Sequence, residues 1–350
     1  MKNDSKYLEI YRRLREDIES GAYTPGSRML SKRACADRFG VSLITVAHAY
    51  ELLCDEGYLT ARERSGFFVS FRAEDSFSVA SGTVAAVVRG SADAGDGFPF
   101  SVYARTMRRV LSEYGEDIFV KSPNSGRAEL TSAIARYLGR SRGIDVKPEQ
   151  IYIGSGAEHL YSIAVKLLGR GRVYAIEKPS YRKIEQVYRA EGIDCEHLAL
   201  CGDGIDSREL EASSESVLHI TPYRSFPSNV TATASKKHEY LAWAQRRDAF
   251  IIEDDCESEF TPSSKPEDTV FSMDRSGRVI YINSFSRTIS PSVRAGYMVL
   301  PESLLPVLDA AAGFYSCTVP TLDQLVLARL LDSGDFERHL NRVRRKNRRV

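Results

Sequence analysis

Two short segments of the chain carry residue types that suit the binding of a small ligand. In the first, residues 155–157 (Ser-Gly-Ala) follow an apolar run and precede a helical pattern. Their backbone N–H groups and the Ser155 hydroxyl would therefore lie at a helix N-terminus, where anions bind. In the second, Asp254 stands at the carboxyl end of an apolar run, which is the end where α/β sheets bind ligands. The alternatives are an ordinary helix cap and a solvated strand end.

A third group of residues suits contact with duplex DNA. Two short helical patterns are joined by residues 39–42 (Phe-Gly-Val-Ser), which is typical of a helix-turn-helix whose second helix enters the major groove. Polar side chains of that helix and basic side chains of the flanking segments would contact bases and phosphates. The candidate DNA-binding residues are Lys32, Arg33, Ser42, Thr45, His48, Arg62, Arg64 and Ser65. The alternative is a small helical subdomain with a solvated charged face.

The elements that would hold these DNA-binding residues lie within residues 6–70. A helical pattern precedes the first turn, and Ser31 and Ser42 are the expected N-caps of the two short helices. Residues 58–60 and 67–70 are predicted to form the two strands of a hairpin, which would serve as the wing.

From about residue 97 the pattern changes to helices that alternate with short apolar strands. The strands are predicted at 173–176, 217–220, 250–252, 279–282 and 297–300, and helices at 129–140, 157–168, 180–191 and 235–247. This alternation favours an α/β domain with a largely parallel sheet. Residues 72–95, rich in Ala, Ser, Gly and Asp, are predicted to be a linker. We therefore expect a winged helix-turn-helix in residues 1–71, the linker in 72–95 and the α/β domain in 96–350.

The composition narrows the classes of protein. Hydrophobic residues make up 43% of the 350 residues, which is enough for two or more packed domains. Because 48 Lys and Arg residues nearly balance 47 Asp and Glu residues, overall charge neither favours nor opposes a nucleic-acid partner. No apolar run is long enough to cross a membrane, and the N-terminus lacks a secretory signal. The six cysteines form no Cys-x-x-Cys pair, so we expect no metal site and a cytoplasmic protein with reduced thiols.

Residues 6–70 resemble the N-terminal domain of the GntR regulators. The segments that carry the resemblance are 23–33, 39–42, 45–46, 49–53, 56–59 and 65–69. The resemblance implies a winged helix-turn-helix that binds double-stranded operator DNA. The chain departs from the family at Leu43 and Ala47, where many members carry an arginine that contacts DNA, so we expect a different operator sequence.

The rest of the chain, from about Phe98, resembles the fold-type I aminotransferases, and its combination with a GntR head is the mark of the MocR-type regulators. The segments that carry the resemblance are 151–157, 177–181, 221–229, 251–260 and 283–297. The resemblance implies an α/β/α large domain that holds pyridoxal 5′-phosphate. Asp254 would pair with the pyridine nitrogen, Tyr181 would stack on the ring, and Arg294 would bind the phosphate. The candidate cofactor-binding residues are Ser155, Gly156, Ala157, Tyr181, Asp254, Ser284, Ser286 and Arg294.

Four positions depart from the aminotransferase pattern. Arg287 stands where the family has the lysine that forms the Schiff base, and a guanidinium cannot act as an imine-forming nucleophile. Cys256 replaces a tyrosine, Ser225 replaces an amide side chain that faces the cofactor, and Asn229 replaces a glycine. Asparagine tolerates the left-handed backbone, so we expect that turn to persist. The sequence ends within the helix that leads to the family's small C-terminal domain, which we expect to be absent.

The resemblance implies a homodimeric transcription regulator without catalytic residues. Its second domain would bind pyridoxal phosphate noncovalently, bind another small ligand, or serve as a dimerisation scaffold without a ligand. Two alternatives remain. An active aminotransferase is opposed by Arg287, by Cys256 and by the expected absence of the small domain. A nonfunctional, truncated remnant would leave apolar surface uncovered.

Overall fold

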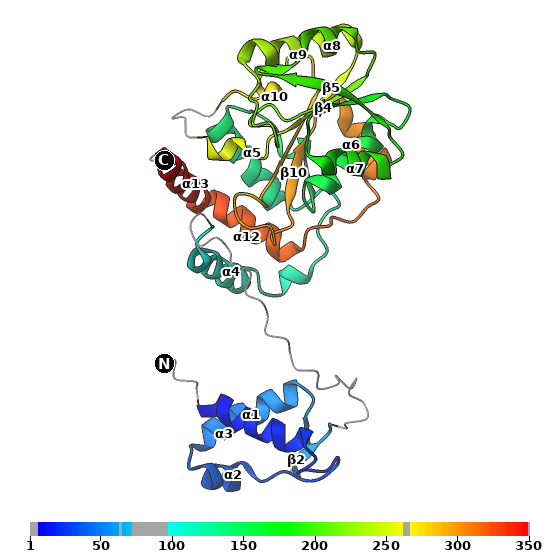
Figure 1. Cartoon of the computed structure of the whole chain (residues 1–350). Helices are drawn as coiled ribbons and strands as arrows, with labels where there is room; N and C mark the ends of the chain where they lie inside the picture. Colours follow the sequence, from blue (N-terminus) through cyan, green and yellow to red (C-terminus); the bar gives the residue numbers. More distant parts are fainter. Residues whose placement is uncertain (1–5, 63–64, 72–96, 262–266, 349–350) are drawn as a thin grey trace. The chain divides into compact units, whose positions relative to one another are not determined.

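The computed structural model describes residues 6–62, 65–71, 97–261 and 267–348, which belong to two compact units (Figure 1). Unit 1 lies within residues 1–90 and unit 2 within residues 91–350. The linker predicted at 72–95 lies outside the described residues, so the domain boundaries stay a prediction. Within the described ranges, no helix is long and apolar enough to cross a membrane.

The described residues of unit 1 form three helices and a two-stranded hairpin (Figure 1). Its elements are α1 (Lys6–Glu19), α2 (Lys32–Phe39), α3 (Leu43–Asp55), β1 (Leu59–Arg62) and β2 (Gly66–Val69). Both predicted helix caps are confirmed. The Ser31 hydroxyl accepts a hydrogen bond from the Ala34 N–H at 3.1 Å, and the Ser42 hydroxyl accepts one from the Thr45 N–H at 3.2 Å. These caps satisfy backbone donors that the first helical turn leaves unpaired.

One hydrophobic core holds unit 1 together. Leu14 of α1 packs with Val46, Tyr50 and Leu53 of α3, and all four side chains are fully buried. The Tyr50 hydroxyl donates to the Leu30 carbonyl at 2.8 Å. Because the buried residues of α3 recur at helical spacing, the opposite face of this helix is left to solvent.

Unit 2 is built on an eight-stranded sheet in the order β3-β10-β9-β8-β7-β4-β5-β6. The strands are β3 (Ile151–Gly154), β4 (Tyr174–Lys178), β5 (Cys195–Cys201), β6 (Gly204–Ile205), β7 (Val217–Ile220), β8 (Phe250–Asp254), β9 (Val279–Ser284) and β10 (Gly296–Val299). Strands β5, β4, β7, β8 and β9 pair in parallel, which confirms the predicted largely parallel sheet. Strand β10 runs antiparallel to both β3 and β9, and β6 runs antiparallel to β5.

Helices cover both faces of this sheet. They are α4 (Phe100–Tyr114), α5 (Ala128–Arg142), α6 (Ala157–Leu168), α7 (Arg182–Ala190), α8 (Ser207–Ala212), α9 (Ala234–Arg247), α10 (Val270–Met273), α11 (Leu305–Ala312), α12 (Thr321–Asp332) and α13 (Asp335–Asn347), with short 3-10 turns at 115–119, 148–150, 258–260 and 302–304. Along β9, Ile280 and Ile282 pack against α6, α7 and α11, whereas Val279 and Tyr281 face the helices of the other layer. The expected three-layer α/β/α architecture is confirmed.

The topology brings the predicted ligand-binding segments to one edge of the sheet. Strands β7, β8 and β9 are parallel, and β3 shares their direction because both β3 and β9 are antiparallel to β10. Their carboxyl ends therefore lie along the same edge. Asp254 ends β8, Ser284 ends β9, and α6 begins shortly after β3.

Candidate functional site

The solvent-facing side of α3 carries three of the predicted DNA-binding residues at its start. The hydroxyl groups of Ser42 and Thr45 lie 2.8 Å apart and are hydrogen-bonded to each other. His48 is exposed, and its ring meets the ring of Tyr7 edge-on at a centroid distance of 5.9 Å. Polar side chains at the start of α3 are thus held in place by local contacts.

Three basic side chains gather on the hairpin. The Lys32 ammonium lies 5.1 Å from the centroid of the Phe67 ring, and the Arg62 guanidinium lies 4.4 Å from that of Phe68. Arg28 pairs through its backbone with Phe68, and its guanidinium lies beside Gly66. We call Arg28, Lys32 and Arg62 the wing cations. Arg28 was not among the predicted residues, because only the backbone pairing with β2 brings it to the hairpin.

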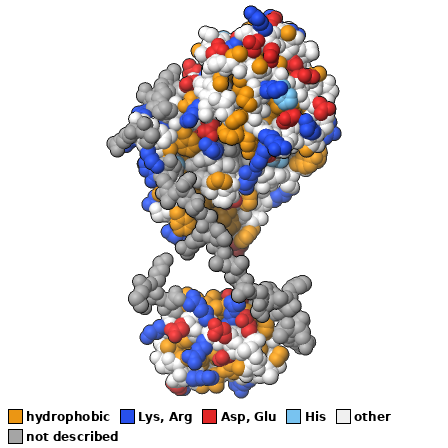
Figure 2. All heavy atoms as spheres, in the orientation of Figure 1, with side chains coloured by type: hydrophobic (Ala, Val, Ile, Leu, Met, Phe, Trp, Pro, Cys, Tyr) orange, Lys and Arg blue, Asp and Glu red, His pale blue; other side chains and the backbone are white. Residues whose placement is uncertain are grey.

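The wing is joined to α3 through the core of unit 1. The rings of Tyr50 and Phe67 pack edge to face at a centroid distance of 5.0 Å, which joins α3 to β2. Arg33 on α2 and Ser65 in the hairpin turn are exposed, whereas Arg64 lies outside the described residues. Basic and hydrophobic side chains both reach the surface of this unit (Figure 2).

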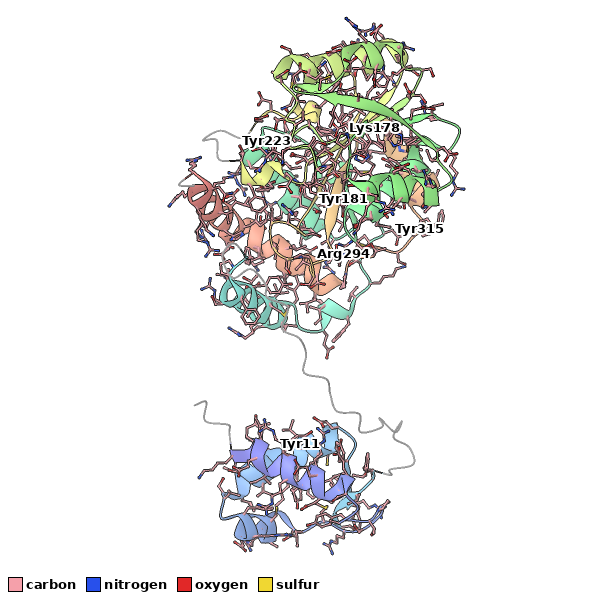
Figure 3. All side chains as sticks on the ribbon, in the orientation of Figure 1. Tyr11, Lys178, Tyr181, Tyr223, Arg294 and Tyr315 are labelled. Atoms are coloured by element: carbon pink, nitrogen blue, oxygen red, sulfur yellow. The ribbon has the colours of Figure 1, made fainter. Side chains whose placement is uncertain are left out.

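Unit 2 has a cavity of about 490 Å³ at the carboxyl edge of the sheet. Its walls are formed by Ala157, Glu158, Tyr161, Tyr181, Lys183, Thr221, Arg224, Phe226, Asn229, Asp254, Cys256, Glu257, Ser284, Ser286, Arg287 and Arg294. Six of the eight predicted cofactor-binding residues are among them, and so is Arg287. Tyr181 and Arg294 lie on the same side of unit 2 (Figure 3). The two predicted residues outside the wall are Ser155, whose carbonyl accepts a hydrogen bond from Arg294 at 3.4 Å, and Gly156.

Gly156 allows the arginine to approach the start of α6 closely. Its φ of +97° is unfavourable for residues with a side chain. A Cβ atom at this position would lie 2.8 Å from Nη2 of Arg294. The backbone conformation therefore favours glycine here, and a side chain at this position would also displace the end of the Arg294 side chain.

Asp254 lies at the bottom of the cavity and has an incomplete set of partners. Its side chain is buried, and one oxygen accepts a hydrogen bond from the Tyr161 hydroxyl. The other oxygen, Oδ1, has no hydrogen-bond partner among the described residues. Burial raises the pKa of Asp254 to about 6, although the hydrogen bond from Tyr161 opposes the shift. A buried carboxylate with one unpaired oxygen suits a ligand that donates a hydrogen bond.

An acidic side chain occupies the predicted anion site. Glu158 accepts hydrogen bonds from Arg294 at 2.8 Å and from Lys183 at 3.2 Å. Burial opposes the ionisation of this side chain, but hydrogen bonds from its own backbone and from the two cations outweigh burial and lower its pKa. Sequence analysis missed this role. The available signal was an acid in the first turn of the helix that follows the Ser-Gly-Ala segment.

Arg287 at the rim of the cavity is paired with a second acid. Its Nη2 atom lies 2.6 Å from Oε1 of Glu257, and its side chain is 60% exposed. Across the cavity, the ring of Tyr181 meets the ring of Phe226 edge-on at a centroid distance of 6.1 Å. The aromatic pair offers an apolar wall, and the cavity holds no lysine at the position of the family's Schiff base.

The loop after β7 adopts the expected backbone without the expected contact. Asn229 has a left-handed φ of +58°, which confirms that asparagine can take the place of glycine in this turn. Ser225 turns away from the cavity and donates to Oε2 of Glu177 at 2.6 Å. Glu177 is buried, which raises its pKa to about 8. The cofactor-facing position of this loop therefore supports the fold rather than the cavity.

A buried ionic cluster lies next to the cavity. The Arg142 side chain is fully buried, and its Nη2 atom lies 3.3 Å from Asp255 and 3.6 Å from Glu259. The Tyr281 hydroxyl donates to Asp255 at 2.8 Å, and the Tyr137 hydroxyl donates to Glu259 at 2.6 Å. Because Asp255 follows Asp254 directly, this cluster fixes the backbone that carries the acid at the bottom of the cavity.

Comparison with known proteins gives two family matches and several relatives. Residues 6–69 match the family of bacterial regulatory proteins, gntR family, and residues 93–349 match the family aminotransferase class I and II. The "Uncharacterized HTH-type transcriptional regulator YdeL" of Bacillus subtilis (strain 168) is 29% identical, over 97% of this chain and 76% of the relative. The "Probable rhizopine catabolism regulatory protein MocR" of Rhizobium meliloti is 28% identical, over 97% of this chain and 74% of the relative.

A solved structure with the same fold as unit 2 is that of an archaeal alanine:glyoxylate aminotransferase. It has a TM-score of 0.63 and 23% sequence identity, over 69% of this chain. The present chain spans 62% of the length of that enzyme. At this level of identity, the likeness shows the fold alone.

Proposed function

We propose that this chain is a DNA-binding transcription regulator with a noncatalytic ligand-sensing domain. The premise is that the chain belongs to the aminotransferase class I and II family and carries a gntR-family domain ahead of that region. The expected pairing of these two domains is confirmed, and relatives along almost the whole chain are named as transcriptional regulators. The observation that carries the proposal is the solvent-facing side of α3 next to the wing cations. A helix with an open face beside positive charge is suited to the major groove.

The first experiment titrates the full chain into a labelled duplex from its own promoter region at two salt concentrations, with and without pyridoxal phosphate. We expect binding to this duplex that exceeds binding to a scrambled duplex and weakens steeply with salt, because each phosphate contact releases a counterion. A change on adding pyridoxal phosphate would support a sensing role. Equal binding to both duplexes, also across a pool of other sequences, would contradict the regulator proposal.

The wing cations are expected to contact phosphate rather than bases. Replacement of Lys32 or Arg62 by Ala should reduce the slope of log K against log[salt] by roughly one and weaken binding to all duplexes alike. Arg170→Ala, which removes an exposed cation of unit 2, is the matched control and should leave the slope unchanged. Fluorescence anisotropy at four salt concentrations measures the slopes. A loss confined to one sequence would indicate base contact instead.

Several residues of the cavity fit a noncovalently bound pyridoxal phosphate. Asp254, with a pKa of about 6, is mostly ionised at neutral pH, and its unpaired Oδ1 would accept the proton of a pyridine nitrogen. Tyr181 would contact the ring face, and Arg294 with the N-terminus of α6 would hold the phosphate. Such a cofactor supplies an aldehyde that reacts with primary amines and a ring that withdraws electrons. Ser284 and Ser286 would orient the phosphate through their hydroxyl groups.

The same cavity does not support transaminase chemistry. Arg287 carries a guanidinium, which cannot act as an imine-forming nucleophile, and it is held by Glu257, so it offers no amine to a carbonyl. We therefore propose that the domain senses a ligand, or acts as a scaffold, without catalysing a reaction. Glu158 favours the scaffold alternative, because it already forms ion pairs with Arg294 and Lys183, the cations that a phosphate would need.

Neutralising Glu158 is expected to strengthen phosphate binding. In Glu158→Gln, Arg294 and Lys183 lose their carboxylate partner, and repulsion between two anions disappears. We expect the affinity for pyridoxal phosphate to rise about tenfold, since partly exposed charges are screened by solvent. Equilibrium dialysis measures the affinity. Glu185→Gln, which neutralises a partly exposed acid of α7 outside the cavity, is the control. Equal affinities in all three proteins would show that the phosphate binds elsewhere.

We also propose a cytoplasmic homodimer. Support comes from three exposed hydrophobic side chains on unit 2, those of Phe119, Val120 and Phe314. The first two lie shortly before Asn124 in the sequence, and the third directly follows Gly313. The Asn124 side chain donates to the Gly313 carbonyl at 2.6 Å, which brings these two segments together. Exposed apolar side chains on neighbouring segments are typical of an interface between protein chains.

A further inference from the structure

The first turn of α3 exposes two large aliphatic side chains. Leu43 is 51% exposed and Ile44 is 69% exposed, although neighbouring Val46 is fully buried. Single exposed hydrophobic residues are common on protein surfaces. Here, however, two lie side by side at the start of the helix that would enter the major groove. Ala47, which is half-buried, lies one turn further along the same face.

The hydroxyl groups at the start of this helix already have partners. Residues 43–55 contain no lysine or arginine, so α3 lacks the side chains that most often contact guanine. The hydroxyl groups of Ser42 and Thr45 are hydrogen-bonded to each other, and Ser42 also caps the helix. The two large exposed side chains in the first turn are therefore hydrocarbon.

We propose that Leu43 and Ile44 determine operator specificity by packing against the C5-methyl groups of thymine. Among the four bases, only thymine presents a methyl group in the major groove, and aliphatic side chains are its natural contacts. The wing cations beside α3 complement the charge of the DNA backbone and would position the helix. This inference rests on the proposed regulator function, because it needs α3 to lie in the major groove.

The test begins with selection of a binding site for the full chain from a pool of random duplexes. We expect the enriched site to contain thymines at fixed positions. Each thymine is then replaced by deoxyuridine, which lacks only the methyl group and keeps every hydrogen-bonding atom. At the contacted positions we expect binding to weaken roughly fourfold per methyl group, as for burial of one hydrocarbon group.

Variants of the two side chains identify the protein partner of each methyl group. In Ile44→Ala, the affinity for the thymine duplex should fall to that for the uracil duplex, so the difference between the two duplexes disappears at one position. Leu43→Ala should act in the same way at a neighbouring position. Leu111→Ala, an exposed leucine on α4 of unit 2, is the matched control and should keep the full difference.

The outcomes separate this inference from the proposal on which it rests. If no sequence is enriched, both fail. If a sequence is enriched but uracil binds as well as thymine at every position, the chain is a regulator and the thymine inference is wrong. It is also wrong if both variants keep the difference between thymine and uracil. A change in the oligomeric state of the variants, with that difference intact, would assign the two side chains to a protein contact.

Discussion

Replacement of Arg142 by Met is expected to lower the free energy of unfolding of unit 2 by about 3–5 kcal/mol, because it leaves Asp255 buried without its cation and leaves Glu259 with Arg344 alone. Methionine fills a similar length of space, so loss of charge rather than of volume dominates. Trp243 is the single tryptophan of the chain and is fully buried in unit 2. Its fluorescence during urea unfolding therefore reports on this unit alone.

The pH dependence of that loss distinguishes charge from packing. Burial already raises the pKa of Asp255, although Arg142 opposes the shift. A carboxyl group whose pKa is raised in the folded state contributes stability that is complete below its unfolded pKa and is lost as pH rises through the folded value. Without Arg142 the folded pKa rises further. The variant should therefore be less impaired at pH 5 than at pH 8, relative to the parent chain.

A control on the same helix sets the scale. Arg136 of α5 forms an exposed ion pair with Asp332 at 2.7 Å, and Arg136→Met should cost less than about 1 kcal/mol. If Arg142→Met costs no more than this control, or if its cost is the same at both pH values, the buried cluster does not stabilise unit 2 in the way described.

The second large effect concerns the position of the family's Schiff base. In Arg287→Lys, we expect pyridoxal phosphate to form a borohydride-trappable adduct at residue 287, whereas the parent chain should form none there. The reason is that an amine can lose its proton and attack a carbonyl, and a guanidinium cannot. Glu257 would favour the charged ammonium, so the yield should rise with pH. Peptide mass analysis after trapping locates the adduct.

Arg224→Lys is the matched control, because it places a lysine in the same cavity at a different point of the wall. It should give no comparable adduct. If Arg287→Lys gives none although equilibrium dialysis shows that pyridoxal phosphate binds, the ligand takes an orientation different from that implied by the resemblance. The noncovalent sensing proposal would then need a different set of contacts.

The strongest sequence patterns predicted their elements closely. Helix α6 (Ala157–Leu168) and strand β7 (Val217–Ile220) have the predicted bounds, because both are strongly apolar and flanked by clear changes of pattern. Strand β5 (Cys195–Cys201) was missed. It contains Glu196 and His197 on exposed positions near the edge of the sheet, so its pattern does not mark a buried strand.

Some residues of the candidate sites could be predicted from the sequence, and others could not. Asp254 and Arg294 were predicted because their neighbours in the sequence resemble a known pattern, and the structure brings them into one cavity. Their site assignments stay predictions until a ligand is measured. Glu158 was missed because its role depends on Arg294, which is 136 positions away. Pairings of this kind arise from the fold, so they cannot be predicted from the spacing of neighbouring residues in the sequence.

The antiparallel strand β10 sets an order for the assembly of unit 2 during protein synthesis. Within the described sheet, β3 has β10 as its only neighbour. Residues 151–154 therefore have no partner strand until residues 296–299 have left the ribosome. Such long-range pairing is slow and leaves apolar segments exposed in the growing chain. The corner that joins Glu158 to Arg294 would be the last part of the cavity to form, whereas unit 1 is complete before most of unit 2 has been synthesised.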